Sequence, residues 1–379
     1  MTSMGTTGFE ITVNIVKTLL VFLMMVQAVP ILVWLERRGS AFIQNRFGPN
    51  RVGPLGLVQL LADAVKFLHK EDFVPDKANR FLFYAAPVFA LIPASVAYMA
   101  IPMSVPLILG ESKFLIQGFD INVGIVFILG ISSLAAYTIL MAGWGSGSKF
   151  SLMGAMRASA QIISYELALG LSIVGVIMTY GSFNLTEMIN AQMGALSFSG
   201  FGYGTTIPWL PNWGIFYQPI GAIIFFAAAF AESNRLPFDL AEGEAELVAG
   251  FHTEYGGFKM LMFFIGEYGH MMIASGLLAT FYFGGYLIPG ITPDEVYQFG
   301  LGTFGSEAAA HIFNSVAHFL MYNVKFALFL WIFIHVRWTL PRFRYDQLMD
   351  LGWKTMLPWA LGNTIVTSIV IFCAAYFKF

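Results

Sequence analysis

Long apolar runs recur along the whole chain, and they restrict its fold more than any other feature of the sequence. Eight of them reach about 20 residues, the length that a helix needs to cross a bilayer. Lipid cannot satisfy free backbone polar groups, so the runs predict an all-α, polytopic membrane protein. The fifth run is the weakest, because Pro219 interrupts it. We place the eight spans near residues 11–34, 80–101, 121–142, 155–180, 213–231, 258–287, 314–336 and 355–377.

The composition agrees with this class. The 379 residues are 57% hydrophobic and 11% charged, with a mean hydropathy of +0.71, and no hydrophilic block is large enough for a separate soluble domain. Residues 1–379 are therefore expected to form a single integral membrane domain. The first run has Glu10 before it instead of a basic cluster, so we interpret it as a retained span and not as a signal peptide.

The sequence gives little sign of a cofactor held by this chain alone. Cys373 is the only cysteine, which excludes disulfide frameworks, zinc sites built on cysteine and cysteine-ligated iron–sulfur clusters. There is no phosphate-binding Walker loop and no dinucleotide fingerprint. We expect no metal site, no redox cofactor and no complete catalytic site on this chain.

Lysine and arginine are distributed unevenly between the two sides. Sixteen of them fall in the odd-numbered loops, whereas the opposite side has only Lys113 and Lys378. Loops rich in these residues stay in the cytoplasm, so both termini are expected on the non-cytoplasmic side. The cytoplasmic loops are then residues 35–79, 143–154, 232–257 and 337–354.

The first of these loops contains an amphipathic pattern over residues 55–70, opened by Gly53 and Pro54. Apolar residues fall on one helical face and polar residues on the other, which is typical of a helix lying at the membrane interface. A shorter helix of this kind is expected around residues 344–351. Arg37 and Arg38 fit interfacial anchoring by side chains that reach the headgroups, while the Gly48-Pro49 and Gly53-Pro54 pairs indicate an ordered turn.

An acidic stretch, residues 231–255, is the second unusual feature. It contains six of the 22 acidic residues of the chain and one arginine, Arg235, and it follows an apolar run directly. A solvated acidic loop is the ordinary interpretation, but these carboxylates alternate with apolar residues. Carboxylates crowded in a partly desolvated place titrate as a coupled set, which could link a redox event to proton uptake. The six are Glu232, Asp239, Glu242, Glu244, Glu246 and Glu254.

Ionisable residues also fall inside the predicted spans. Such residues usually face the bundle interior, where they either pair between helices or mark a route for ions or protons. Two of them are carboxylates, and together with the acidic stretch they favour a proton route. The set is Lys17, Glu166, Glu267, His270, His318 and Lys325.

Four segments together resemble the quinone-site membrane subunit of the respiratory complex I family (the H subunit, also called NADH dehydrogenase subunit 1). They are Glu36-Arg-Arg through Pro54 with residues 59–66, Ser164-Tyr-Glu166, residues 232–255, and residues 337–349. They occur in family order over most of the chain, and the third is highly specific by itself. The departures, such as Ser233 and Leu236 where Thr and Pro are frequent, remove no carboxylate.

The resemblance implies a bundle of about eight transmembrane helices that lines a quinone chamber and couples quinone reduction to proton translocation. It assigns quinone-binding roles to Glu36, Arg46, Asp63, Lys66, Arg235, Asp239, Arg337 and Arg342. It assigns a proton path to Glu166, Glu232, Glu242, Glu244, Glu246, Glu254 and Glu267.

The resemblance also implies partners. Quinone, either ubiquinone or menaquinone, is the substrate, while FMN and iron–sulfur clusters belong to other subunits. The expected partners are the other membrane-arm subunits, the iron–sulfur and quinone-site subunits of the hydrophilic arm, and membrane lipids, but no nucleic acid. Chain length favours a bacterial inner membrane over the mitochondrial one. Two alternatives stay open: a membrane subunit of a ferredoxin-fed or hydrogenase complex, and a stand-alone cation–proton antiporter.

Overall fold

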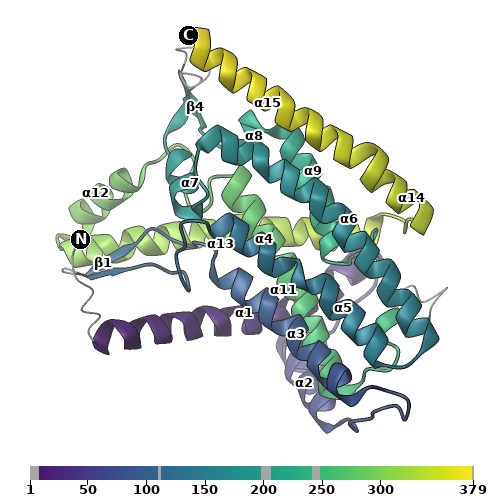
Figure 1. Ribbon diagram of the computed structural model, residues 1–379. Helices are drawn as coiled ribbons and strands as arrows, with labels where there is room; N and C mark the ends of the chain where they lie inside the picture. The colour runs from purple at the N-terminus through teal and green to yellow at the C-terminus, as the bar shows by residue number, and fades with distance from the viewer. Residues whose placement is uncertain (1–7, 110–111, 198–205, 241–247, 378–379) are drawn as a thin grey trace.

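The computed structural model describes residues 8–109, 112–197, 206–240 and 248–377, and within them the chain is mostly helical (Figure 1). Among the described residues, seven helical segments are long and apolar enough to cross a membrane, which confirms a polytopic membrane protein. They comprise α1 (Gly8–Ile43), α3 (Arg80–Met99), α4 with α5 (Gly124–Ser132 and Leu134–Gly145), α6 (Lys149–Tyr180), α11 (Gly257–Tyr282), α13 (Glu307–Thr339), and α14 (Tyr345–Asp350) continued by a π-helical turn (Leu351–Met356) into α15 (Leu357–Phe377).

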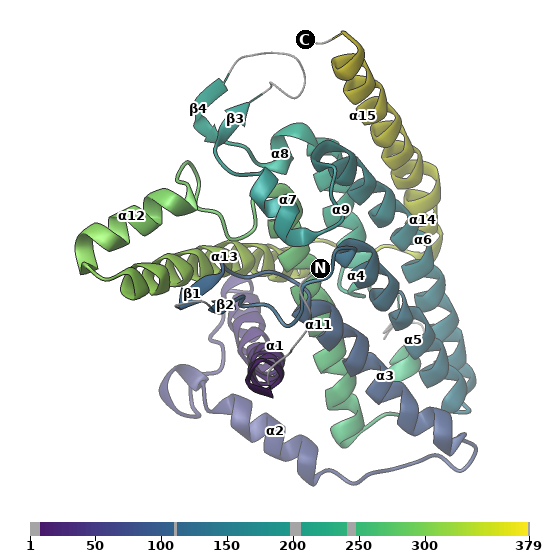
Figure 2. The same ribbon diagram turned by 60° about the vertical axis from the view of Figure 1, so that its left-hand side comes forward.

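The structure differs from the sequence prediction at the fifth span. Helix α9 (Pro219–Glu232) has only 14 residues, which corresponds to about 21 Å of helix against the roughly 30 Å of a hydrocarbon core. Pro219 occupies the first turn, where proline is well tolerated, and so fixes where the helix starts. The helix packs against α6, α11 and α15, so its carboxyl end lies inside the bundle (Figure 2).

Several other helices extend beyond their predicted spans. Helix α1 continues to Ile43, so Glu36, Arg37 and Arg38 belong to its last turns and not to a loop. Helix α6 likewise begins at Lys149, before its predicted start at residue 155. Helix α13 extends beyond its predicted bounds at both ends, from Glu307 to Thr339. The predicted first span ends where its apolar run meets charged residues, beginning with Glu36. A helix does not stop there, because arginine and glutamate are good helix formers.

The predicted cytoplasmic loops meet at one end of the bundle, which we call the α2 end. Helix α2 (Gln59–His69) follows a short 3-10 turn (Pro54–Gly56) and lies across this end, at the bottom of Figure 2. The backbone N–H of Asn79 donates to the carbonyl of Gly145, and the backbone N–H of Phe343 donates to the carbonyl of Pro237. A second 3-10 turn (Gly250–His252) packs on the start of α6.

The opposite end, the hairpin end, contains more regular structure than the predicted connecting loops. Two small antiparallel pairs form there, one pairing Ile108 with Lys113 and the other pairing Ser197 with Thr206. Figure 1 shows α12, β1 and α7 together on this side. The elements are β1 (Leu107–Leu109), β2 (Ser112–Phe114), α7 (Leu185–Ala191), β3 (Ala195–Ser197), β4 (Thr206–Pro211), α8 (Gly214–Tyr217) and α12 (Pro293–Phe304).

Candidate functional site

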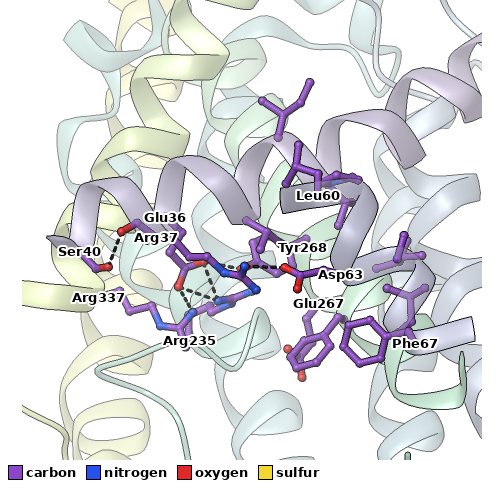
Figure 3. A pocket seen from close by; sticks show the side chains of 18 of the residues that line it. Glu36, Arg37, Ser40, Leu60, Asp63, Phe67, Arg235, Glu267, Tyr268 and Arg337 are labelled. Atoms are coloured by element: carbon purple, nitrogen blue, oxygen red, sulfur yellow. Dashed lines mark hydrogen bonds and ion pairs between the residues drawn. The ribbon is translucent and has the colours of Figure 1, made fainter. Parts of the chain in front are cut away.

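A buried carboxylate, Glu36 of α1, is the centre of a network of charges. Its Oε2 atom lies 3.2 Å from Nη1 of Arg235, and its Oε1 atom accepts a hydrogen bond from Nη1 of Arg337. The Tyr268 hydroxyl donates to the same Oε2 atom at 2.5 Å. Figure 3 shows both guanidinium groups turned toward this carboxylate. Removing one member of a buried ion pair typically costs about 3–5 kcal/mol, so these residues depend on one another.

The arginine from the acidic stretch reaches Glu36 because the chain turns sharply after α9. Gln161 of α6, which is fully buried, holds this turn: its amide nitrogen donates to the carbonyls of Ala231 and Phe238 at 2.8 and 2.7 Å. The Arg235 guanidinium then lies over the Tyr268 ring, 4.1 Å from its centroid. A cation over an aromatic face is attracted by the ring quadrupole, so Tyr268 orients Arg235 as well as Glu36.

The network lies in the wall of a cavity of about 790 Å³ between α1, α2 and α11. The rest of the wall is largely apolar, with Val29 and Pro30 from α1, Leu60 and Phe67 from α2, and Phe264 from α11. Cavities of this size hold small organic ligands, with apolar walls for the body and a few polar groups for orientation. The arrangement suits a ligand that has an apolar body and a polar head.

Some buried donors of the network have no partner among the described residues. Within the described residues, the buried Nε and Nη2 atoms of Arg235 and the buried Nε atom of Arg337 have no acceptor. Buried N–H groups of a charged side chain normally find a partner. Arg235 and Arg337 both line the cavity, so its polar part contains two guanidinium groups, which suit an acceptor oxygen such as a ketone carbonyl.

Helix α2 is attached to α1 by an ion pair at the edge of the cavity. Nη1 of Arg37 lies 2.5 Å from Oδ2 of Asp63, and Gln59 donates to the other carboxylate oxygen. Partial burial alone would raise the pKa of the Asp63 carboxyl, but these hydrogen bonds and the charges of Arg37 and Lys66 together lower it below its usual value. Arg37 therefore pairs with α2, which is more specific than the headgroup anchoring suggested by its position in the sequence.

A second, much smaller cavity lies deeper in the bundle. It measures about 30 Å³ and is lined by Glu232 of α9 and by Glu267 and His270 of α11. A volume of this size can hold a water molecule. Glu267 also lines the large cavity, so a single carboxylate belongs to both.

Glu166 extends this acidic group toward α6. Glu232 is close enough to Glu166 for their charges to repel, and it lies within hydrogen-bonding reach of the Ser132 hydroxyl. Three carboxylates from three helices, Glu267, Glu232 and Glu166, thus follow one another away from the large cavity. Like charges gathered in a desolvated place share protons instead of ionising together.

His252, in the 3-10 turn of the acidic stretch, lies beside Glu267 of this series. Its Nε2 atom lies 3.6 Å from Oε1 of Glu267, and its side chain is 2% exposed. Burial lowers the pKa of the His252 ring to about 3. The ring is therefore neutral near pH 7 and adds no positive charge beside Glu267.

Most of the predicted quinone-site residues meet in the large cavity. Those that line it are Glu36, Arg46, Asp63, Arg235, Asp239 and Arg337. Lys66 and Arg342 do not line the cavity but contact residues that do. The Lys66 ammonium lies 3.5 Å from Asp63, and the Arg342 guanidinium donates to the carbonyl of Asp239.

The predicted proton-path residues are brought together only in part. Glu166, Glu232 and Glu267 form the series above, whereas Glu254 lines neither of the two cavities. Glu242, Glu244 and Glu246 lie outside the described residues. Sequence reasoning missed Tyr268, because a tyrosine inside an apolar run carries no local signal of its partner.

Comparison with known proteins shows the family of this chain. The family model described as NADH dehydrogenase matches residues 16–368. The NADH-quinone oxidoreductase H subunit of Bdellovibrio bacteriovorus is 69% identical, covering 98% of this chain and 99% of that protein. The H 1 subunit of Cytophaga hutchinsonii is 44% identical over 89% and 90%, and the H 1 subunit of Geobacter metallireducens is 41% identical over 96% and 98%. This chain belongs to the family of the NADH-quinone oxidoreductase H subunit, a membrane component of complex I.

Proposed function

We propose that this chain forms the membrane-side wall of the quinone chamber of a proton-translocating NADH:quinone oxidoreductase in a bacterial inner membrane. The observation that carries the proposal is the buried Glu36 network beside an apolar cavity. The cavity accepts the isoprenoid body of ubiquinone or menaquinone, and the guanidinium groups of Arg235 and Arg337, which line it, bind a carbonyl of the headgroup. Both termini then lie on the non-cytoplasmic side.

The chain contributes the binding wall and not the electrons. Electrons come from the iron–sulfur subunit of the hydrophilic arm, whose clusters and FMN are held by partner subunits, and quinone gains two electrons and two protons to become quinol. Negative charge that develops on the headgroup oxygen is stabilised by the two guanidinium groups. As the guanidinium groups are attracted to this negative charge, their interaction with Glu36 weakens.

Glu267 links this event to proton movement, because it lines the quinone cavity and the small cavity of Glu232. Two unit charges about 10 Å apart interact by roughly 1.7 kcal/mol at an effective dielectric constant of about 20. That energy exceeds the roughly 1.4 kcal/mol of one pKa unit, so it changes the ratio of protonated to ionised carboxylate by about tenfold or more. The change in the protonation of Glu267 then alters the protonation of Glu232 and, in turn, of Glu166 inside the bundle.

A photoreactive short-chain quinone tests the chamber in the assembled, reconstituted enzyme. We expect it to label peptides of α1, α2 and α11, and natural quinone to compete with the label. Labelling confined to other subunits would contradict the chamber. Co-purification of a nickel hydrogenase, or rapid cation exchange by the isolated chain in liposomes, would point instead to the alternative functions.

Glu232→Gln tests the coupling separately, because glutamine keeps the shape of the side chain and cannot ionise. We expect the variant to assemble and to bind quinone while proton translocation is lost. Glu187→Gln is a matched control, since Glu187 is bonded to Ser182 at the hairpin end, away from both cavities. Unchanged proton translocation in Glu232→Gln would refute the role of the carboxylates.

A further inference from the structure

A polar stripe runs along one buried face of α13, and none of its residues lines the quinone cavity. Its four residues follow one another at spacings of four, four and three, which places them on the same side of a helix. Their exposed fractions are 7%, 0%, 1% and 6%. Polar groups buried within a membrane span are costly and mark functional routes. The stripe consists of Asn314, His318, Tyr322 and Lys325.

Lys325 is anchored at one end of the stripe. Its Nζ atom donates to the carbonyls of Phe283, Gly285 and Leu287 at 2.7, 2.9 and 2.6 Å, where the chain turns after α11. These three bonds use every N–H of the ammonium group. Lys325 therefore cannot satisfy the other members of the stripe.

The other three members have buried polar atoms without partners among the described residues. Nδ1 of His318 lies 2.8 Å from the carbonyl of Asn314, which can only accept, so Nδ1 carries the hydrogen and Nε2 is left as an acceptor. That Nε2 atom, the Tyr322 hydroxyl and Oδ1 of Asn314 are all buried and unbonded. Leaving such buried groups without a partner is unfavourable, so each calls for one.

We propose that the α13 stripe holds a short file of ordered water that relays protons toward the hairpin end of the bundle. A water molecule beside one helical turn accepts from the Tyr322 hydroxyl and donates to Nε2 of His318, and another donates to Oδ1 of Asn314. Each water molecule both accepts and donates, so the proton passes from water to water, while the side chains of the stripe hold the water molecules in place. Buried water of this kind commonly completes the bonding of buried polar groups.

Both ends of the stripe continue into further polar groups. The Tyr286 ring lies 6.1 Å from the His318 ring, and its hydroxyl donates to Asn190 at the hairpin end. The exposed carboxylate Asp120 is close enough to Tyr286 to act on it electrostatically. Toward the interior, Tyr322 is a close neighbour of Tyr98 on α3. The relay depends on the proposed function in one respect: quinone reduction has to supply the protons that it carries.

Radiolytic hydroxyl labelling of the intact oxidoreductase tests the water directly, because a buried side chain is labelled only where ordered water lies beside it. We expect Tyr322 and His318 to be labelled several-fold more than Tyr165. Tyr165 is the matched control: it is fully buried, and its hydroxyl donates to the carbonyl of Leu348 at 2.7 Å. Equal labelling of Tyr322, His318 and Tyr165 would overturn the proposal whether or not any variant folds.

Tyr322→Phe and His318→Leu test the relay in reconstituted enzyme, with Tyr165→Phe as the control. We expect quinone reduction within about twofold of the unmodified enzyme and at least a halving of the protons translocated per electron. An unchanged ratio, or loss of quinone reduction itself, would overturn the relay. Unmodified enzyme that reduces quinone without acidifying liposomes would contradict the proposed function and leave the labelling result standing.

Discussion

The Tyr268 hydroxyl donates a hydrogen bond of 2.5 Å to Oε2 of Glu36. The same carboxylate holds Arg235 and Arg337, and the Tyr268 ring lies under the Arg235 guanidinium. One tyrosine therefore positions both the anion and one of the cations of the network. In a site that excludes water, such positioning decides whether the donors meet a ligand oxygen at bonding distance.

Tyr268→Phe is expected to lower kcat/KM for quinone about tenfold or more. The ring stays under Arg235, but a hydrogen bond to a charged group, worth about 1.5–3 kcal/mol, is lost. The measurement is steady-state quinone reduction by assembled enzyme. Tyr282→Phe is the control, because the Tyr282 hydroxyl makes only a long bond of 3.4 Å to Ser172 and lies outside the cavity. Equal kinetics in the two variants would contradict the positioning role.

Arg337→Lys is expected to raise KM for quinone about tenfold, whereas Arg342→Lys should change it little. Both substitutions keep the charge, but lysine lacks the planar fork that lets one guanidinium hold Glu36 and still offer a spare N–H. Arg337 lines the cavity, while Arg342 only donates to the carbonyl of Asp239 behind it. A titration of quinone reduction against quinone concentration checks both variants, and equal shifts in KM would argue against a specific role for Arg337.

The sequence was sufficient for the membrane class and for most of the spans, because apolar runs of fixed length reflect a simple physical demand of the bilayer. It also predicted Glu36, Arg235 and Arg337, through family resemblance. What it could not show was that these residues meet. Glu36 is 199 residues from Arg235 and 301 from Arg337, and such contacts depend on helix packing. No local period encodes that packing.

Two further features were predicted from the sequence only in part or not at all. The fifth run is the weakest of the eight, because Pro219 interrupts it, but the prediction still counts it as a span. Helix α9 is short because Pro219 starts it late, yet composition alone cannot tell a short buried helix from part of a span. Tyr268 is one of 15 tyrosines, and only its neighbours in space give it a role. The division of labour between Asp63, which lines the cavity, and Lys66, which supports it from behind, likewise follows from the rotation of α2 about its axis.

Acidification is expected to loosen the turn around His252. In the folded chain the ring stays neutral down to about pH 3, whereas in an unfolded segment it takes up a proton near pH 6.5. The unfolded form therefore binds more protons over this range, and local stability falls as the pH drops from about 6.5 toward 3. Hydrogen exchange of amides 248–256, corrected for intrinsic rates, measures the effect between about pH 7 and pH 5. His252→Phe should abolish most of this pH dependence; an unaltered dependence would assign it to other groups.

Close packing of α6 on the same turn supports a final prediction. A Cβ atom at Gly154 would lie 2.7 Å from Cα of Gly250, a backbone atom that cannot rotate away. Gly154→Ala must therefore displace the turn that contains His252, the residue beside Glu267. Overpacking of this kind typically costs about 1–3 kcal/mol.

Gly170→Ala provides the matched control on the same helix, since a Cβ atom there has no neighbour within 4 Å among the described residues. Alanine at an open helix position is favoured over glycine by about 1 kcal/mol, so this variant should be neutral or slightly more stable. Thermal inactivation of quinone reduction and proton translocation per electron are measured for both. We expect Gly154→Ala to inactivate at a lower temperature and to translocate fewer protons per electron. The same profile in both variants would mean that the contact between Gly154 and Gly250 does not hold the turn in place.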